Sequence, residues 1–127
     1  MAFPLKRFLA LMPGSLLVAL SQIEIEDENE NGLVLSADGW PITFDKRSQV
    51  VSCYGQPAVT FSSIESVVLA HFTNGKRFEW WVLSLMLRGG KTLAIGRSTD
   101  GAQASIVAAH VATITAKRVS AVKRVGL

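Results

Sequence analysis

The acidic stretch from Asp27 to Asp38 contains the residues whose types and spacing come nearest to metal chemistry. Its opening, Asp27-Glu28-Asn29-Glu30-Asn31-Gly32, places oxygen-bearing side chains at alternate positions before a glycine, as a calcium-binding loop does. The twelfth position is Asp38, one carbon shorter than the bidentate glutamate of such loops, and the following Trp40-Pro41 prevents an exit helix. We therefore interpret the stretch as an acidic hairpin, with a weak divalent-cation site as the alternative.

Two histidines and one cysteine are the other residues with possible chemistry. His71 and His110 have no second imidazole or thiol at ligand spacing, which argues against a metal site at either. Cys53 and His71 could form a thiol nucleophile and its base, but no third group stands out to orient the histidine. We expect no catalytic residue, no bound metal and no cofactor, and we expect Cys53 to be packed as a small apolar side chain.

Two basic segments resemble phosphate-binding sequences only superficially. Gly89-Gly90-Lys91 lacks the upstream glycine and the following helix of a phosphate loop, so it is predicted to be a hairpin turn. Lys117-Arg118 and Lys123-Arg124 could contact phosphates, but aromatic residues for base stacking are missing around them. The sequence therefore argues against nucleic-acid binding.

The elements that must position these residues are mostly short strands. Apolar residues alternate with polar ones in a series of short runs, and turn residues such as Asn31-Gly32, Asp45–Ser48 and Asn74-Gly75 separate the runs. About seven strands follow one another without a helix between them, apart from one helical turn expected near Phe61 and Ile64. This order predicts a mainly β (α+β) fold, in the form of a small bent barrel or sandwich.

One helix is expected near the end of the chain, and it should close the open side of the sheet. Asp100 is the predicted N-cap. Apolar residues recur at helical spacing along one stripe, which comprises Ala104, Val107, Ala108, Val111 and Ile114. Ile106, His110 and Thr113 fall on the opposite side. We expect the apolar stripe to be buried and the other side to be solvated.

The longest predicted strand, 78–88, is apolar on both faces. Trp81, Leu83, Leu85 and Leu87 form the face expected to point inward. The face expected to point outward carries four large apolar residues, Phe78, Trp80, Val82 and Met86. Such a face marks either a contact surface or a region covered by another part of the chain, and both interpretations predict that it is not bare.

Residues 1–21 are apolar and allow three interpretations. Lys6 and Arg7 precede a run from Phe8 and Leu9 to Leu20 that is too short to span a bilayer and is broken by Pro13-Gly14. The segment is a helix packed on the domain or on a partner, an interfacial segment, or a cleaved signal peptide. No transmembrane helix is predicted.

The chain has the size of one domain and an uneven distribution of charge. It has 127 residues and a net charge of +3, which allow one core and exclude a strongly polyanionic or polycationic protein. Five acidic residues and no basic residue lie between 22 and 30, whereas one acidic residue and seven basic residues follow Trp81. We divide the chain into residues 1–21, a single domain at 22–120 and a basic tail at 121–127.

Several of these segments together resemble the bacterial pleckstrin-homology-like (PH-like) domains over about residues 33–119. The resemblance rests on Phe44-Asp45-Lys46-Arg47, on Phe61, Ile64 and Val67 at their spacing, and on Leu85–Lys91, followed by the alanine-rich helix. It implies a bent antiparallel barrel of about seven strands capped by a C-terminal α-helix, and a scaffold that docks proteins or lipid headgroups without catalysis. The Asp45–Ser48 turn supplies only two bases, so no lipid-binding motif can be transferred.

These observations favour a non-enzymatic docking module of bacterial type that binds a protein complex or a membrane surface. The expected contact residues are Phe78, Trp80, Val82 and Met86, together with Phe8, Leu9, Lys117 and Arg118. The single cysteine fits a cytoplasmic protein or one peripheral to the inner membrane. The alternative is a small exported, periplasmic domain with a cleaved signal and a cation at the acidic hairpin. The sequence leaves the oligomeric state open.

Overall fold

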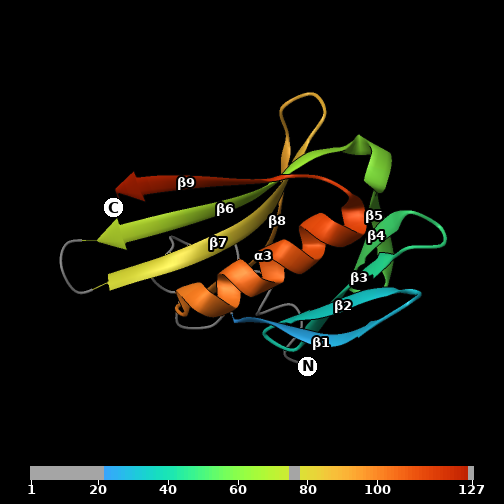
Figure 1. The fold of residues 1–127 in the computed structure, drawn as a ribbon, viewed down its shortest axis with the longest axis horizontal. Coiled ribbons are helices and arrows are strands. Elements are labelled where there is room, and N and C mark those ends of the chain that lie inside the picture. Colours follow the sequence, from blue (N-terminus) through green and yellow to red (C-terminus); the bar gives the residue numbers. More distant parts are fainter. Residues whose placement is uncertain (1–21, 75–77, 126–127) are drawn as a thin grey trace.

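The computed structural model describes residues 22–74 and 78–125. Along the chain, short strands are followed by one helix and a last strand (Figure 1). The elements are β1 (Ile23–Asn29), β2 (Gly32–Ala37), β3 (Trp40–Asp45), β4 (Val50–Cys53), β5 (Gln56–Thr60), the 3₁₀ turn η1 (Phe61–Ser63), β6 (Ile64–Asn74), β7 (Phe78–Leu87), β8 (Thr92–Ser98), α3 (Gly101–Thr115) and β9 (Val119–Val125). The mainly β fold with a C-terminal helix, predicted from the sequence, is confirmed.

The strands form two sheets, and α3 lies in the opening between them (Figure 1). One sheet has the order β1-β2-β3-β4-β5, in which each strand pairs antiparallel with the next along the chain. The other has the order β8-β7-β6-β9. No ladder joins the two sheets within the described residues, so the expected bent barrel takes the form of two sheets that do not close on each other.

A single apolar core lies between the two sheets and the helix. Phe44 and Leu35 from the first sheet and Leu83 from the second are completely buried in it. The helix contributes Val107 and Val111, which are also completely buried, as its apolar stripe predicts. Burial of each such side chain is worth about 1.5–3 kcal/mol. Ile114 is only partly buried, and the neighbouring Thr115 is buried instead because its hydroxyl donates to the Val111 carbonyl oxygen at 2.7 Å.

Local hydrogen bonds stabilise both ends of α3. The Asp100 carboxylate accepts hydrogen bonds from the amides of Ala102 and Gln103 at 3.0 and 3.2 Å, so the predicted N-cap is confirmed. At the other end Ala116 adopts a left-handed conformation with φ of 58°. Its amide donates to the carbonyl oxygens of Ala112 and Thr113, and the chain leaves the helix there to enter β9.

The described residues form nine strands rather than about seven, and β5 is one of the two additional strands. In the sequence, Gly55-Gln56-Pro57 favours a break after the preceding strand, because glycine and proline both interrupt strands. Instead Tyr54 and Gly55, with φ of 56° and 80°, form a two-residue turn, and the chain returns as β5. Pro57 lacks an amide donor, but β5 is the edge of its sheet, where a proline is tolerated.

The other additional strand is β9, which lies where a basic tail was expected. The segment 121–127 belongs to β9 as far as Val125, so the expected domain boundary at 120 falls inside a strand. β9 pairs parallel with β6 over seven residue pairs, from Val67 opposite Val119 to Thr73 opposite Val125. It is the only parallel pairing among the ladders of the described residues.

The predicted Asn31-Gly32 turn is displaced by one residue. The loop between β1 and β2 is Glu30-Asn31, and Gly32 already belongs to β2. A Cβ atom at Gly32 would lie 2.2 Å from the carbonyl oxygen of Phe44 on β3. The glycine is therefore required for the close approach of two strands rather than for a turn.

Candidate interaction surface

The four-stranded sheet has one face toward the core and one face away from it. Along β6 and β7 the odd-numbered residues Val67, Leu69, Leu83 and Leu85 belong to the core. Because successive side chains in a strand alternate between faces, the even-numbered residues point away from the helix. We call the side chains of this second side the outer face.

The register aligns the outer-face residues in rows across the sheet. Phe72 on β6 lies opposite Trp80 on β7 and opposite Arg124 on β9. In the next row, Ala70 lies opposite Val82 and Val122, and Val82 lies opposite Arg97 on β8. Side chains in such rows are neighbours on one face. The outer face is therefore a continuous band of aromatic and aliphatic groups with an arginine on each side.

Three aromatic rings form the centre of the outer face. The rings of Phe72 and Trp80 are stacked, with centroids 5.4 Å apart and planes 5° from parallel. Phe78 meets Trp80 edge-on at 6.2 Å. Trp80 is only 8% exposed although it lies outside the core cluster, whereas Phe78 is 47% exposed. The predicted outward face of 78–88 is thus buried at Trp80, partly buried at Val82 and Met86, and open at Phe78.

The charges of the outer face are positive. The even-numbered positions of β6 and β7 carry no acidic side chain, and Arg97 and Arg124 lie beside them. The Nε of Arg97 is buried and has no hydrogen-bond partner among the described residues, and burial lowers the pKa of its guanidinium. An unsatisfied buried donor costs about 1–3 kcal/mol, and no group in the part of the chain that the structure describes compensates this cost.

His71 lies on β6, on the opposite face of the sheet from Phe72 and Trp80, and its contacts are not those of a catalytic histidine. The imidazole is stacked on Trp81 at 4.5 Å, and its Nε2 lies 2.8 Å from Oε1 of Glu79. Cys53 lies on β4 in the other sheet, and no contact joins it to His71. Burial raises the pKa of the Cys53 thiol, which makes it a poorer nucleophile at neutral pH.

The acidic stretch forms a hairpin and does not surround a cation. Asp27 lies opposite Val34, and Asp38 comes four residues after Val34, beyond the end of β2, so the first and twelfth positions of the supposed loop do not converge. Glu28 instead pairs with Nδ1 of His110 at 2.7 Å. No group of three or more His, Cys, Asp or Glu residues in the described chain could hold a metal ion.

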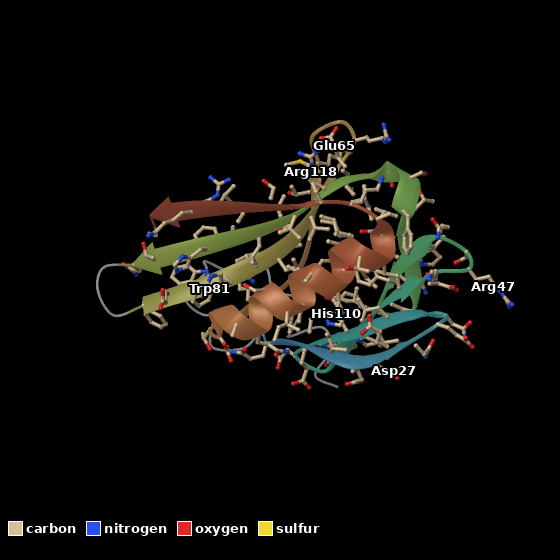
Figure 2. The ribbon with its side chains drawn as sticks, viewed as in Figure 1. Asp27, Arg47, Glu65, Trp81, His110 and Arg118 are labelled. Atoms are coloured by element: carbon tan, nitrogen blue, oxygen red, sulfur yellow. The ribbon has the colours of Figure 1, made fainter. Side chains whose placement is uncertain are left out.

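The remaining predicted contact residues do not all join the outer face. Lys117 and Arg118 connect α3 to β9, and Arg118 lies at the end of the sheet away from Trp81 (Figure 2). The Arg118 carbonyl oxygen accepts the amide of Val67 at 2.9 Å, so its backbone holds the start of β9. Phe8 and Leu9, like all of residues 1–21, lie outside the described residues.

Two features of the surface were not predicted. Arg97 and Arg124 were not recognised as part of the outer face, because only the register of β8 and β9 places them there. A groove of about 670 Å³ lies between β3, the β4–β5 turn and β8, and it is lined by Trp40, Cys53, Tyr54 and Leu93 among others. The rings of Trp40 and Tyr54 meet edge-on at 5.4 Å beside it. The sequence signal for this groove is Gly55, which permits a tight turn after Tyr54, but it does not show that a further strand follows the turn.

Comparisons with known proteins add no further guidance. The chain matches no protein-family model, no curated protein and no solved structure. No helix in the described residues is long and apolar enough to cross a membrane.

Proposed function

We propose that this protein is a non-enzymatic docking module that binds a protein partner through the outer face of the β8-β7-β6-β9 sheet. The observation that carries the proposal is the ring cluster of Phe72, Phe78 and Trp80, which lies outside the single core and on the side of the sheet away from α3. Aromatic residues and arginine dominate the binding energy of protein interfaces, and both are present here.

The rigidity of the cluster favours a protein partner over a lipid surface. Trp80 is held by two ring contacts and is 8% exposed, so its indole is not positioned to insert into a bilayer. The patch lies on a sheet rather than at a projecting loop, and a pre-ordered sheet face loses little side-chain entropy on binding another protein. Arg97 and Arg124 would then receive carboxylate or carbonyl acceptors from the partner.

The arrangement of elements supports, as part of this proposal, a PH-like scaffold. The Asp45 carboxylate accepts from the amides of Arg47 and Ser48, so the Phe44-Asp45-Lys46-Arg47 segment enters a tight turn, as in the family it resembles. Phe61, Ile64 and Val67 form the bend into β6 and are all buried. The strand β9 goes beyond the expected pattern of about seven strands and a final helix. In this proposal the domain works in the cytoplasm or peripheral to the inner membrane.

A site-specific photo-crosslinker tests the proposal directly. p-Benzoylphenylalanine placed at Phe78, which is 47% exposed, should capture a specific protein after irradiation in the native host. The matched control is the same residue placed at Ile106, which is 50% exposed on the outer side of α3. Capture at 78 alone supports the proposal, and equal capture at both positions or at neither overturns it.

Substitution and lipid binding complete the test. Phe78→Ser should weaken association with the captured protein at least about tenfold, because it removes a large apolar contact, whereas Ile106→Ser should not. Flotation with phosphatidylglycerol-containing vesicles examines the membrane alternative. If the protein floats with the vesicles, and flotation is lost in Phe78→Ser but retained in Ile106→Ser, the outer face binds a membrane surface rather than a protein partner.

A further inference from the structure

Each of the two sheets ends in a seven-residue edge strand, and the two edges have opposite charge. β1 is one edge of the five-stranded sheet, and β9 is one edge of the four-stranded sheet. β1 carries four acidic residues, Glu24, Glu26, Asp27 and Glu28, all exposed. Lys123 and Arg124 are exposed on β9, and Lys117 and Arg118 directly precede it.

The charges at these edges are mostly uncompensated within the chain. Glu24 and Glu26 make no ion pair or hydrogen bond through their side chains in the described structure, and neither do Lys123 and Arg124. Like charges facing each other across two paired strands are destabilising. Pairing of β9 with another β9, or of β1 with another β1, would therefore bring like charges together, whereas β1 with β9 would not.

Among the described residues, the backbone of β9 has a row of hydrogen-bonding groups with no partner strand. Because the Arg118 carbonyl oxygen accepts from Val67 on β6, alternate residues from 118 onward direct their backbone groups toward β6. The intervening residues Val119, Ala121 and Lys123 direct their amides and carbonyls to the other side. An exposed strand edge of this kind is a template for another strand.

We propose that β9 of one copy pairs with β1 of a second copy, so that the protein assembles head to tail through oppositely charged sheet edges. Such a contact uses two different surfaces of the chain, so it propagates into a ring or an open chain of copies rather than ending at a dimer. The contact shares Arg124 with the outer face, but it uses the backbone edge of the sheet rather than the ring cluster of Phe72, Phe78 and Trp80. The β1 bulge between Ile25 and Asp27 limits the paired stretch to part of the strand.

The first test is sedimentation of the full chain at low and high salt. Charged edges interact over about 30 Å at about 0.01 M salt but over only about 3 Å at about 1 M. We expect the average mass to rise with protein concentration at low salt and to approach that of one chain at high salt. A single-chain mass at every concentration and at both salts would overturn the proposal.

A charge exchange identifies the two edges. Glu24→Lys, Glu26→Lys and Asp27→Lys together leave β1 with three basic residues and one acidic residue, so this chain has two basic edges. Lys123→Glu with Arg124→Glu gives a chain with two acidic edges. Each variant alone should bind itself at least about tenfold more weakly than the original chain. An equimolar mixture should regain association, because each acidic edge again meets a basic one. Undiminished association of either variant alone, or no recovery in the mixture, contradicts the assignment.

A proline tests the backbone pairing itself. Ala121→Pro removes an amide that points away from β6, so the β6–β9 ladder is retained while the free edge loses a donor. Ala121→Ser keeps the amide and serves as the matched control, and circular dichroism checks that both variants are folded. Association should be lost in the first variant and kept in the second. Phe78→Ser should leave it unchanged, which separates this contact from the docking surface.

Discussion

Replacement of Val111 by alanine should destabilise the domain by about 2 kcal/mol. The valine is completely buried in the middle of α3, and it belongs to the one core shared by both sheets. Loss of two methyl groups removes about 1.6 kcal/mol of burial energy, and the cavity left behind adds about 1 kcal/mol. The higher helix propensity of alanine offsets about 0.5 kcal/mol of this loss in stability.

Thr113→Ala is the matched control, because Thr113 lies two residues away on the exposed side of the same helix. It loses the hydrogen bond from its hydroxyl to the Ala109 carbonyl oxygen at 2.8 Å, but gains helix propensity, so its stability should change by less than about 0.5 kcal/mol. A domain of this size loses about 4–8 °C per kcal/mol. Thermal unfolding followed by circular dichroism should therefore show a midpoint about 8–16 °C lower for Val111→Ala and little change for Thr113→Ala.

The aspartate variants sharpen the same test. Val111→Asp would place a carboxylate in the core without a partner, and a penalty of several kcal/mol should leave the chain unfolded. Thr113→Asp should fold. Equal midpoints for the two positions, with either replacement residue, would show that the buried face of α3 has been assigned incorrectly.

Three further predictions concern single contacts. Asp100→Ala should lower the unfolding free energy in urea by about 1 kcal/mol because the helix loses its N-cap, whereas Asp100→Asn should retain most of it. Gly96→Ala should lower the free energy of unfolding by about 1–3 kcal/mol, because the added Cβ would lie 1.9 Å from Cγ2 of Ile23. The loss should be smaller in an Ile23→Ala background. Additive effects in this double-mutant cycle would contradict the contact. The raised pKa of Cys53 should slow the alkylation of its thiol by iodoacetamide relative to the unfolded chain. The plot of alkylation rate against pH should be displaced to higher pH in the folded protein. Identical plots for the folded and unfolded chains would show that burial does not act on the thiol. The same shift favours folding below the thiol's unfolded-state pKa, and this contribution should be lost as the pH rises through the folded-state pKa.

The parts of the fold that depend on neighbouring residues could be predicted from the sequence. The 3.6-residue repeat from Ala104 to Val111 and the capping side chain of Asp100 determine α3 locally, and both agree with the structure. The alternation in β7 likewise placed Leu83 and Leu85 in the core. These features need no knowledge of which strand pairs with which.

The parts that depend on distant neighbours could not be predicted. Pro57 favours a break in a strand, and the sequence around it does not show that β5 is an edge strand, where a proline is tolerated. The valines of β9 gave no strand signal, since that strand exists only through its ladder with β6. For the candidate surface, the alternation of side chains along β7 places Trp80 on the outer face correctly. Its burial, however, depends on Phe72, which lies opposite it on β6. Arg97 and Arg124 join the surface for the same non-local reason.

The parallel ladder between β6 and β9 has a consequence for the order of folding events. Its two strands are separated along the chain by β7, β8 and α3, so the loop that must close before they meet is the longest among the paired strands. Closure of a long loop is entropically slow, and the antiparallel hairpins can form first. We expect β9 to be the last strand to join its sheet and the first to detach, and its amides to lose hydrogen-exchange protection before those of β6 and β7.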